Sequence, residues 1–178
     1  REQRFYDNGV SNKKEEESVM ERITSFCIDH DRLKKGLYLS RIDGDVVTYD
    51  MRMCVPNQGV YLENAGLHTF EHLLATYVRN SVYRDQVIYA GPMGCRTGFY
   101  FLCRDRVSKQ EVIALLQAAC AFIKDFEGEI PGASCSAECG NYLDHDLQQA
   151  KRYAQDYLQV IQAWKPEDMI YEDSDKAL

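Results

Sequence analysis

Apolar and polar side chains alternate through the segment Asp45-Val46-Val47-Thr48-Tyr49-Asp50-Met51-Arg52-Met53-Cys54-Val55. One side of the pattern carries large apolar residues, namely Val47, Tyr49, Met51, Met53 and Val55. A period of two places them on one face of a β-strand, with Arg52 on the other face. The pair Pro56-Asn57 ends the pattern. We therefore predict a half-buried strand over residues 45–55.

The segments that follow predict a mixture of strands and helices. Apolar runs at 87–90 and 97–104 are typical of strands, and a tight Gly-Pro-Met-Gly-Cys-Arg segment joins them. Helical spacing of apolar residues predicts helices at 66–82 and 144–164, and another that opens on the capping-box sequence Ser108-Lys109-Gln110-Glu111. Because regular βαβ alternation is missing, we predict a single α+β domain in which an antiparallel sheet packs against helices.

Size and charge restrict the class of protein. The chain has 178 residues, which suits one domain whose core needs neither disulfides nor a structural metal. We expect residues 1–19, which include the run Lys13-Lys14-Glu15-Glu16-Glu17, to lie outside the core, and residues 20–178 to form the domain. A net charge of -7 without a basic stripe argues against nucleic acid as a partner.

Cysteine usage and hydropathy suggest the compartment. The chain has seven cysteines, an odd number without regular spacing, which is typical of a reducing cytosol rather than of a secreted disulfide framework. No apolar run approaches the roughly 18 residues of a membrane span. We therefore expect a cytoplasmic protein that acts on a small molecule, without a membrane or nucleic acid as partner.

The sequence His68-Thr69-Phe70-Glu71-His72 lies within the helix predicted at 66–82. At about 3.6 residues per turn, histidines four positions apart share a helix face, and both imidazoles can reach one divalent ion. A catalytic metal site needs a third protein ligand and a fourth position that is open to water or substrate. The alternative interpretation is that the two histidines only form hydrogen bonds in a half-buried layer.

Several residues can supply the third ligand, and the residues alone leave them open: His30, Cys95, Cys135, Cys139 and His145. The three thiols lie in loops rich in small residues, where packing does not explain them. The remaining cysteines lie in apparent strands or helices, where a thiol usually serves as a small hydrophobe, and we expect them to be inert: Cys27, Cys54, Cys103 and Cys120. By default, Arg52 would be a solvated strand residue, and His30, within Asp29-His30-Asp31, would be a surface ion-pair or capping residue.

Five motifs in order resemble the S-ribosylhomocysteine lyase family, known as LuxS. The resemblance covers residues 25–158. Its anchors are Ser25-Phe26 through Asp29-His30, Arg52 with Pro56-Asn57, His68-Thr69-Phe70-Glu71-His72-Leu73-Leu74, Pro92-Met93-Gly94-Cys95-Arg96-Thr97-Gly98, and Cys139-Gly140 followed by His145-Asp146-Leu147. The resemblance implies cleavage of S-ribosylhomocysteine to homocysteine and 4,5-dihydroxy-2,3-pentanedione. The second product is the precursor of autoinducer-2 in quorum sensing, and the first returns to the methyl cycle.

The resemblance also implies roles for individual residues. His68, His72 and Cys139 would bind one divalent metal per subunit, Fe2+ natively, with Zn2+ or Co2+ possible. Glu71 and Cys95 would be the acid and base residues of catalysis.

Further residues would bind the substrate, namely Ser25, His30, Arg52 and Arg79. The resemblance also implies a homodimer with active sites at the subunit interface. Many members of the family carry Asp-Ile-Ser where this chain has Tyr89-Ala90-Gly91, so no acidic contact to the substrate ammonium is evident here.

The chemistry of these residue types suits the reaction of the family. A sugar carbonyl moves from C1 to C2 and then to C3, after which the thioether leaves by β-elimination. A metal with an open position acts as a Lewis acid for each enolate, while two side chains move protons between neighbouring carbons. Cys95 can act as a base only as a thiolate, which the metal and the Arg52 cation would both favour.

Two other functions remain in competition. His-x-x-Glu-His also occurs in small metallopeptidases, in which the glutamate activates a metal-bound water and a distant carboxylate is usually the third ligand. A non-catalytic module whose metal stabilises a dimer would instead have a closed site with four protein ligands.

Overall fold

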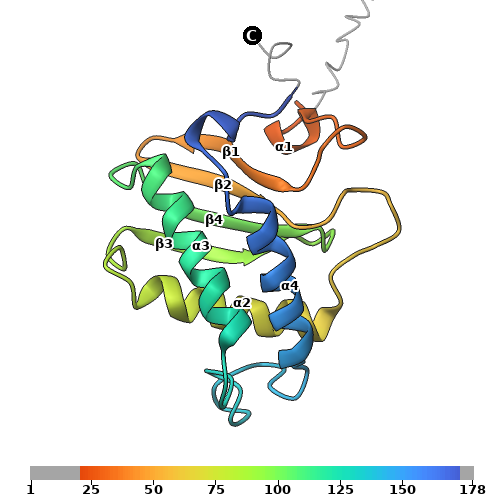
Figure 1. The fold of residues 1–178 in the computed structure, drawn as a ribbon, viewed down its shortest axis with the longest axis vertical. Helices are drawn as coiled ribbons and strands as arrows, with labels where there is room; N and C mark the ends of the chain where they lie inside the picture. The colour runs from red at the N-terminus through yellow and green to blue at the C-terminus, as the bar shows by residue number, and fades with distance from the viewer. Residues whose placement is uncertain (1–20, 173–178) are drawn as a thin grey trace, which may run out of the picture.

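The computed structural model describes residues 21–172, and the expectation that residues 1–19 lie outside the core falls outside the described residues. Figure 1 shows the arrangement of the helices and strands. In chain order they are α1 (Thr24–Cys27), β1 (Gly36–Asp43), β2 (Val46–Arg52), α2 (Asn64–Arg79), β3 (Val87–Pro92), β4 (Gly98–Arg104), α3 (Lys109–Asp125), α4 (Leu147–Ile161) and the 3-10 helix η1 (Pro166–Asp168).

The strands form one antiparallel sheet in the order β1-β2-β4-β3 (Figure 1). The central pair runs in register from Val46 opposite Arg104 to Arg52 opposite Gly98. At that last pair the strands come so close that a Cβ on Gly98 would lie 2.1 Å from the carbonyl oxygen of Met51. Glycine therefore fixes the point at which the loop before β4 leaves the sheet.

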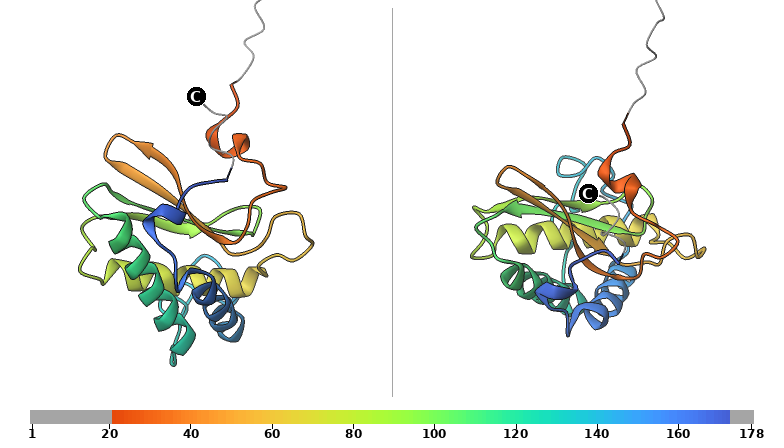
Figure 2. Two further views of the ribbon diagram at one scale, coloured as in Figure 1. Left: turned by 45° about the horizontal axis from the view of Figure 1, so that its top comes forward. Right: turned by 90° about the horizontal axis from the view of Figure 1, so that it is seen from above.

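One face of the sheet is apolar and is covered by helices. The side chains of Tyr49, Met51, Phe99 and Phe101 are at most 2% exposed, and they alternate along β2 and β4 as a period of two requires. Figure 2 shows α2, α3 and α4 gathered on the same side of the sheet. The predicted α+β layout with an antiparallel sheet is confirmed.

The helices follow the sequence signals closely. The predicted capping box is present at the start of α3, where Ser108 accepts a hydrogen bond from the backbone of Glu111 and the Glu111 carboxylate accepts one from the backbone of Ser108. In α2 the apolar stripe is buried in the core, namely Leu67, Phe70, Leu73, Leu74 and Val78. The Asp146 side chain caps α4 by accepting from the backbone of Gln149.

Several elements differ from prediction. Helix α2 runs from Asn64 to Arg79 rather than over 66–82, and β3 ends at Pro92 rather than at residue 90. Strand β1 was not predicted; Tyr157 and Trp164 hold it by donating to the carbonyl oxygens of Gly36 and Leu37. Strand β2 ends at Arg52 rather than at residue 55, because the next two N–H groups both donate to the carbonyl of Thr97. Helix α4 begins at Leu147 and ends at Ile161, within the predicted 144–164.

Two expectations about single residues are wrong. Arg52 is not solvated: its side chain is 3% exposed, because Asp50 on the same face of β2 supplies a buried carboxylate. Cys27 is not a core residue but is exposed, because the short helix α1 buries none of its residues. The other cysteines expected to be inert, Cys54, Cys103 and Cys120, are buried.

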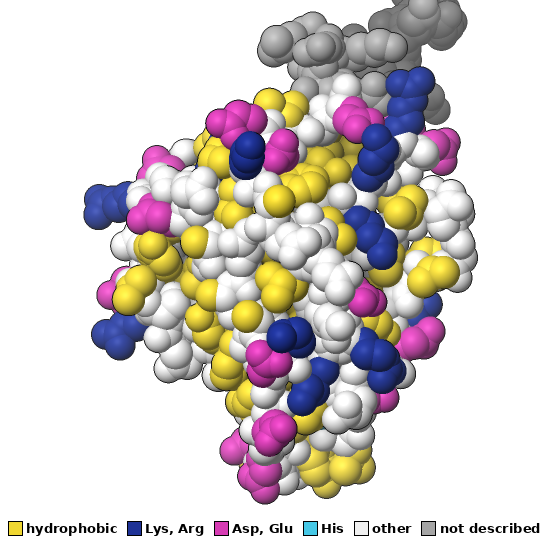
Figure 3. Space-filling model, in the orientation of Figure 1, with side chains coloured by type: hydrophobic (Ala, Val, Ile, Leu, Met, Phe, Trp, Pro, Cys, Tyr) yellow, Lys and Arg dark blue, Asp and Glu magenta, His cyan; other side chains and the backbone are white. Residues whose placement is uncertain are grey.

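The surface shows no segregation of charge on the face drawn in Figure 3, where Lys and Arg side chains are interspersed with Asp and Glu. Within residues 21–172, no helix combines the length and the hydropathy that crossing a bilayer would require.

Candidate active site

Helix α2 presents His68 and His72 on a face that does not point into the core. Phe70, Leu73 and Leu74 fill the core side and are fully buried, whereas both histidines are half-buried. A spacing of four residues aligns the two imidazoles. Their rings lie with centroids 4.6 Å apart and planes at 86°.

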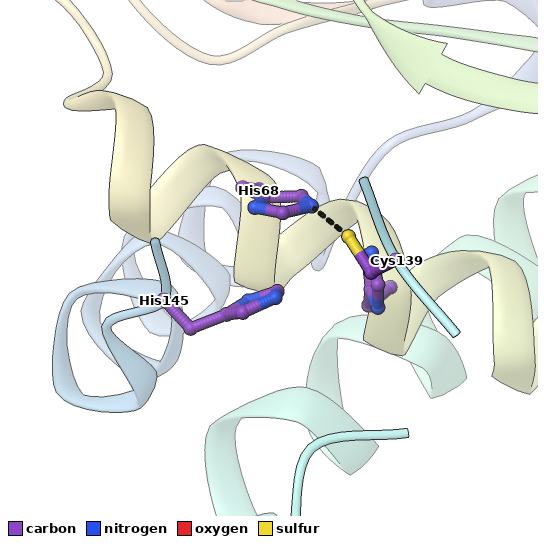
Figure 4. A group of neighbouring side chains, drawn as sticks. His68, Cys139 and His145 are labelled. Carbon is purple, nitrogen blue, oxygen red and sulfur yellow. Dashed lines mark hydrogen bonds between the residues drawn. The ribbon is translucent and has the colours of Figure 1, made fainter. Parts of the chain in front are cut away.

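The loop between α3 and α4 brings a thiol to these rings. Figure 4 shows Cys139 from this loop facing His68, with His145 close by. The Sγ atom of Cys139 lies 3.3 Å from Nε2 of His68. The potential ligand atoms of His68, His72, Cys139 and His145 all lie within 4.8 Å of one another. We call these four residues the His/Cys cluster.

Hydrogen bonds on the far side of each ring set the tautomers of the α2 histidines. Nδ1 of His68 lies 2.9 Å from the carbonyl oxygen of Asp144, and Nδ1 of His72 lies 2.7 Å from that of Pro131. A carbonyl only accepts, so both Nδ1 atoms carry the proton and both Nε2 atoms keep their lone pairs. Gly132, with φ 72°, allows the loop to approach the ring of His72 closely.

This donor set fits a divalent transition metal. Two imidazole nitrogens and a thiol are typical ligands of zinc and iron, and the carbonyls behind the rings are the orienting partners that such sites use. Burial, and after it the neighbouring His68 and His72, lower the pKa of His145 to about 4, so this ring is neutral near pH 7. Among the described residues the cluster contains no carboxylate.

Glu71 lies on α2 between the two histidines of the cluster. It is half-buried, and within the described part of the chain its carboxylate has no hydrogen bond and no ion pair. A carboxylate that has no hydrogen bond and no ion pair is available to exchange protons with a ligand.

A second group of predicted residues lines a cavity of about 700 Å³ at one end of the sheet. It includes Ser25, His30, Arg52 and Cys95, together with Phe26, Tyr61, Thr97 and Tyr100. His30 is oriented by its Nδ1, which lies 2.9 Å from the carbonyl oxygen of Ile28. Four residues from three of the sequence motifs thus share one cavity.

Arg52 is the buried charge in this cavity. Its Nε and Nη2 donate to the two carboxylate oxygens of Asp50 at 3.1 and 2.6 Å, and its Nη1 donates to Oγ1 of Thr97 at 2.6 Å. Burial opposes the positive charge, but the charge of Asp50 and its hydrogen bonds outweigh burial and raise the pKa of Arg52. The guanidinium is therefore locked in one orientation.

Cys95 is connected to this network through Thr97. The two side chains lie 3.1 Å apart, Sγ to Oγ1, and the thiol is exposed to the cavity. Because Thr97 already accepts from Arg52, its own hydroxyl proton is free to point at the sulfur.

The loops around the cavity are conformationally unusual. Among the described residues, the non-glycine residues with positive φ are Asn57 at 60° and Arg96 at 58°, and both line the cavity. Such conformations cost energy and often occur at functional sites. The Arg96 conformation closes the turn that presents Cys95, in which the N–H of Arg96 donates to the carbonyl of Met93.

Three residues of this region were not predicted from the sequence. Asp50 and Thr97 hold Arg52, and Tyr171 donates to Oδ2 of Asp50 at 2.9 Å. Of these three residues, only Asp50 could have been predicted as a partner of Arg52 from the sequence. It lies two positions before Arg52 on the same strand, so the two side chains share one face of the strand. His145 was weighed only as a possible third ligand.

Arg79 joins neither group. It is the last residue of α2, and its Nη2 donates to the carbonyl oxygen of Ile88 at 3.0 Å. Its position thus gives no support to a role in binding the substrate.

The cluster and the cavity lie apart within one chain. Arg52 and Tyr100 are on the face of the sheet that the helices leave open, whereas the cluster belongs to the helix side, on α2 and the loop before α4 (Figures 2 and 4). Among residues 21–172, no cluster residue lines the cavity, and no hydrogen bond or ion pair joins the two groups.

Comparison with known proteins places the chain in one family. A model of the S-ribosylhomocysteinase (LuxS) family matches residues 23–168. The chain is 47% identical over 160 residues to the S-ribosylhomocysteine lyase of Porphyromonas gingivalis, covering 86% of this chain and 100% of that protein. It is 45% identical over 157 residues to the enzyme of Phocaeicola vulgatus, covering 85% and 97%, and 44% identical over 156 residues to that of Finegoldia magna, covering 85% and 99%. The chain therefore belongs to the S-ribosylhomocysteinase (LuxS) family.

Proposed function

We propose that this protein is a metal-dependent lyase that cleaves S-ribosylhomocysteine to homocysteine and 4,5-dihydroxy-2,3-pentanedione. The observation that carries the proposal is the cluster of two imidazole nitrogens and a thiol beside an unpaired glutamate, in a chain of this family. The second product would serve as the autoinducer-2 precursor in quorum sensing, and homocysteine would return to the methyl cycle. We place this activity in the cytoplasm, where seven cysteines can stay reduced.

The residues proposed to hold the metal are His68, His72 and Cys139. When bound there, a divalent ion supplies Lewis acidity toward the carbonyl and hydroxyl oxygens of the substrate. We propose Fe2+ as the native ion, with Zn2+ and Co2+ as functional substitutes, since the nitrogen and sulfur donors accept all three.

Glu71 and Cys95 are proposed to move the protons. The Glu71 carboxylate has no partner among the described residues, so it can take a proton from one sugar carbon and return it to the next. The Cys95 sulfur lies at the end of the series Arg52, Thr97, Cys95, in which each group donates a hydrogen bond to the next when the sulfur is ionised. A cation behind that series favours the thiolate that acts as a base.

The remaining cavity residues are proposed to bind the substrate. The Arg52 guanidinium, Ser25 and His30 surround the space in front of Cys95 and offer polar contacts to a hydroxylated chain. Arg79 stays a prediction, since its guanidinium is engaged with the carbonyl of Ile88.

We further propose that the complete active site forms between two copies of the chain. Cys95 and the metal must act on the same sugar, yet in one chain the cavity and the cluster lie on different sides of the sheet and helix layers. The rim of the cavity carries uncovered apolar side chains: Phe26, which lines it, is 63% exposed, and Val60, which precedes the lining residue Tyr61, is 69% exposed. A homodimer would cover this rim and place the cluster of one subunit opposite the cavity of the other.

The competing metallopeptidase function receives less support. Such an enzyme usually has a carboxylate as its third metal ligand. At the His/Cys cluster the third donor is instead the thiol of Cys139. The cavity around Cys95 would also have no role in peptide hydrolysis.

The test is a thiol-release assay. The purified protein, loaded with Fe2+ or Co2+, is incubated with S-ribosylhomocysteine, and homocysteine is titrated with a chromogenic disulfide against a blank without substrate. We expect thiol release equimolar with the substrate consumed, and its loss after chelation. Absence of thiol release by the metal-loaded protein, or cleavage of a control peptide in its place, would refute the proposal.

A further inference from the structure

His145 is the member of the His/Cys cluster to which no role has been given, and its tautomer follows from the hydrogen bonds of Thr69. The Thr69 hydroxyl donates its single proton to the carbonyl of Ala65 at 2.9 Å and accepts from the N–H of Asp146 at 2.9 Å. Nδ1 of His145 lies 3.0 Å from the same oxygen. With the hydroxyl proton directed at the carbonyl of Ala65, Nδ1 of His145 is the donor to the Thr69 oxygen.

The other ring nitrogen of His145 is therefore an acceptor. Nε2 is buried and has no hydrogen-bond partner among the described residues. The His145 ring lies beside His68 and Cys139 (Figure 4), and its potential ligand atom lies within 4.8 Å of those of His68, His72 and Cys139. An unpaired buried acceptor is costly, so a donor from outside the chain is expected to satisfy it.

Ring geometry separates His145 from the three ligands. The rings of His145 and His68 are stacked, with centroids 4.0 Å apart and planes inclined by only 22°. An imidazole binds an ion along a lone pair that lies in its ring plane. The in-plane lone pairs of His68 and His145 therefore do not converge on one point, whereas the plane of His72 crosses that of His68 at 86°. His68, His72 and Cys139 would hold the ion, with His145 beside these three ligands.

We propose that Nε2 of His145 accepts a hydrogen bond from the water or substrate hydroxyl that takes the ligand position left open by His68, His72 and Cys139. His145 would then select ligands that carry a hydrogen on or next to the atom that binds the ion. The sugar as the natural ligand rests on the proposed function, but the selection itself follows from the site alone.

The test compares Co2+-loaded wild type with His145→Phe and His145→Gln by visible absorption spectroscopy. Phe keeps the ring that stacks on His68 and removes the acceptor, whereas Gln restores an acceptor without the ring. Each protein is titrated with dihydroxyacetone, an α-hydroxyketone, and with azide, which has no hydrogen to donate. No turnover is needed, so failure of the lyase assay is a separate result.

We expect all three proteins to bind Co2+ with the same stoichiometry and similar ligand-field bands. Affinity for dihydroxyacetone should fall about ten-fold in His145→Phe, which is the loss expected for one strong hydrogen bond. It should recover in His145→Gln, and the affinity for azide should stay unchanged in both variants. Loss of Co2+ or of band intensity in His145→Phe would make His145 a ligand and overturn the proposal. Equal changes for both probes, or a wild-type spectrum that responds to neither, would also overturn it.

Discussion

Thr97 connects residues that sequence motifs single out separately. Its hydroxyl accepts from Arg52 at 2.6 Å and lies 3.1 Å from the sulfur of Cys95, and its side chain is buried. Arg52 is fixed by the carboxylate of Asp50 on its other side. The orientation of the proposed catalytic thiol thus depends on Thr97, a residue to which no catalytic role is assigned.

Replacing Thr97 by valine should therefore affect both stability and thiol chemistry. The change leaves Nη1 of Arg52 without an acceptor in a buried site, which costs roughly 1–3 kcal/mol. We expect a matching fall in the free energy of unfolding by urea, and slower alkylation of Cys95 by iodoacetamide. Thr97→Ser keeps the hydroxyl and serves as the control; equal behaviour of the two variants would contradict this account.

The proposed proton carriers make a second prediction. Cys95→Ala and Glu71→Gln should each keep the metal content of the wild type, because neither is a proposed ligand. Each should lower kcat by about 10²- to 10⁴-fold, the usual contribution of a general acid or base. Metal analysis and the thiol-release assay measure both quantities.

The matched control for these variants is Cys135→Ala. Cys135 is another exposed thiol, in the same loop as Cys139. Its replacement should leave turnover unchanged. Full activity in Cys95→Ala or Glu71→Gln would remove that residue from the mechanism, and metal loss would assign it a structural role.

At the residue scale, sequence predicts reactive groups better than their partners. The spacing of His68 and His72 predicted a shared face, and the structure places both beside Cys139. Asp50, Thr97 and the hydroxyl of Thr69 were not predicted as partners. A hydrogen bond depends on strand register and loop path, which a single residue type does not encode.

At the element scale, helix α3 owes part of its stability to a local signal. Ser108 and Glu111 cap its first turn reciprocally. Hydrogen bonds from the hydroxyl and then the backbone N–H of Ser108 lower the pKa of Glu111. A carboxylate with a lowered pKa in the folded state stabilises the fold above its ordinary pKa of about 4.5, and this stabilisation is lost as pH falls through the lowered value.

Ser108→Ala should destabilise the protein by about 1 kcal/mol near pH 7, the usual value for loss of an N-cap. The difference from wild type should shrink as the pH falls below the ordinary carboxyl pKa, because Glu111 then becomes protonated in both proteins. Denaturant unfolding at several pH values measures this. Ser108→Thr is the control, and a difference that grows with acidification would rule out the capping interaction as its source.

Strand β1 illustrates what local signals leave out. The capping box and the alternation of residues 45–55 are readable because their determinants lie within a few residues. Strand β1 is held instead by pairing with β2 and by Tyr157 and Trp164, more than a hundred positions away in sequence. Its β-bulge between Leu39 and Arg41 also interrupts the period of two that would have predicted it.

At the scale of the whole molecule, the cavity and the cluster occupy different layers of the fold. The sheet separates Arg52 and Cys95 from the helix face that carries the histidines, and the exposed rim around Phe26 borders the cavity. The sequence motifs predicted the residues of both groups but not that the groups lie apart. The order of motifs along a chain does not indicate whether a motif lies on the sheet or on the helices.

This separation makes a prediction about mixed dimers. In a dimer of Cys95→Ala with Glu71→Gln, one site would combine the intact cluster of the first chain with the intact cavity of the second. The two inactive variants, unfolded and refolded together, should therefore recover activity. Random pairing of the two variants makes about half of the dimers mixed, and each mixed dimer has one intact site out of two. Activity should therefore recover to about a quarter of the wild-type rate.

Each variant refolded alone is the control, and size-exclusion chromatography establishes that the mixture is dimeric. If Glu71 and Cys95 of the same chain served one site, every site in the mixture would lack one of them, and the activity would stay at the level of the separate variants. Recovery therefore requires a site shared between subunits, because no arrangement within one chain can restore both groups to a single sugar.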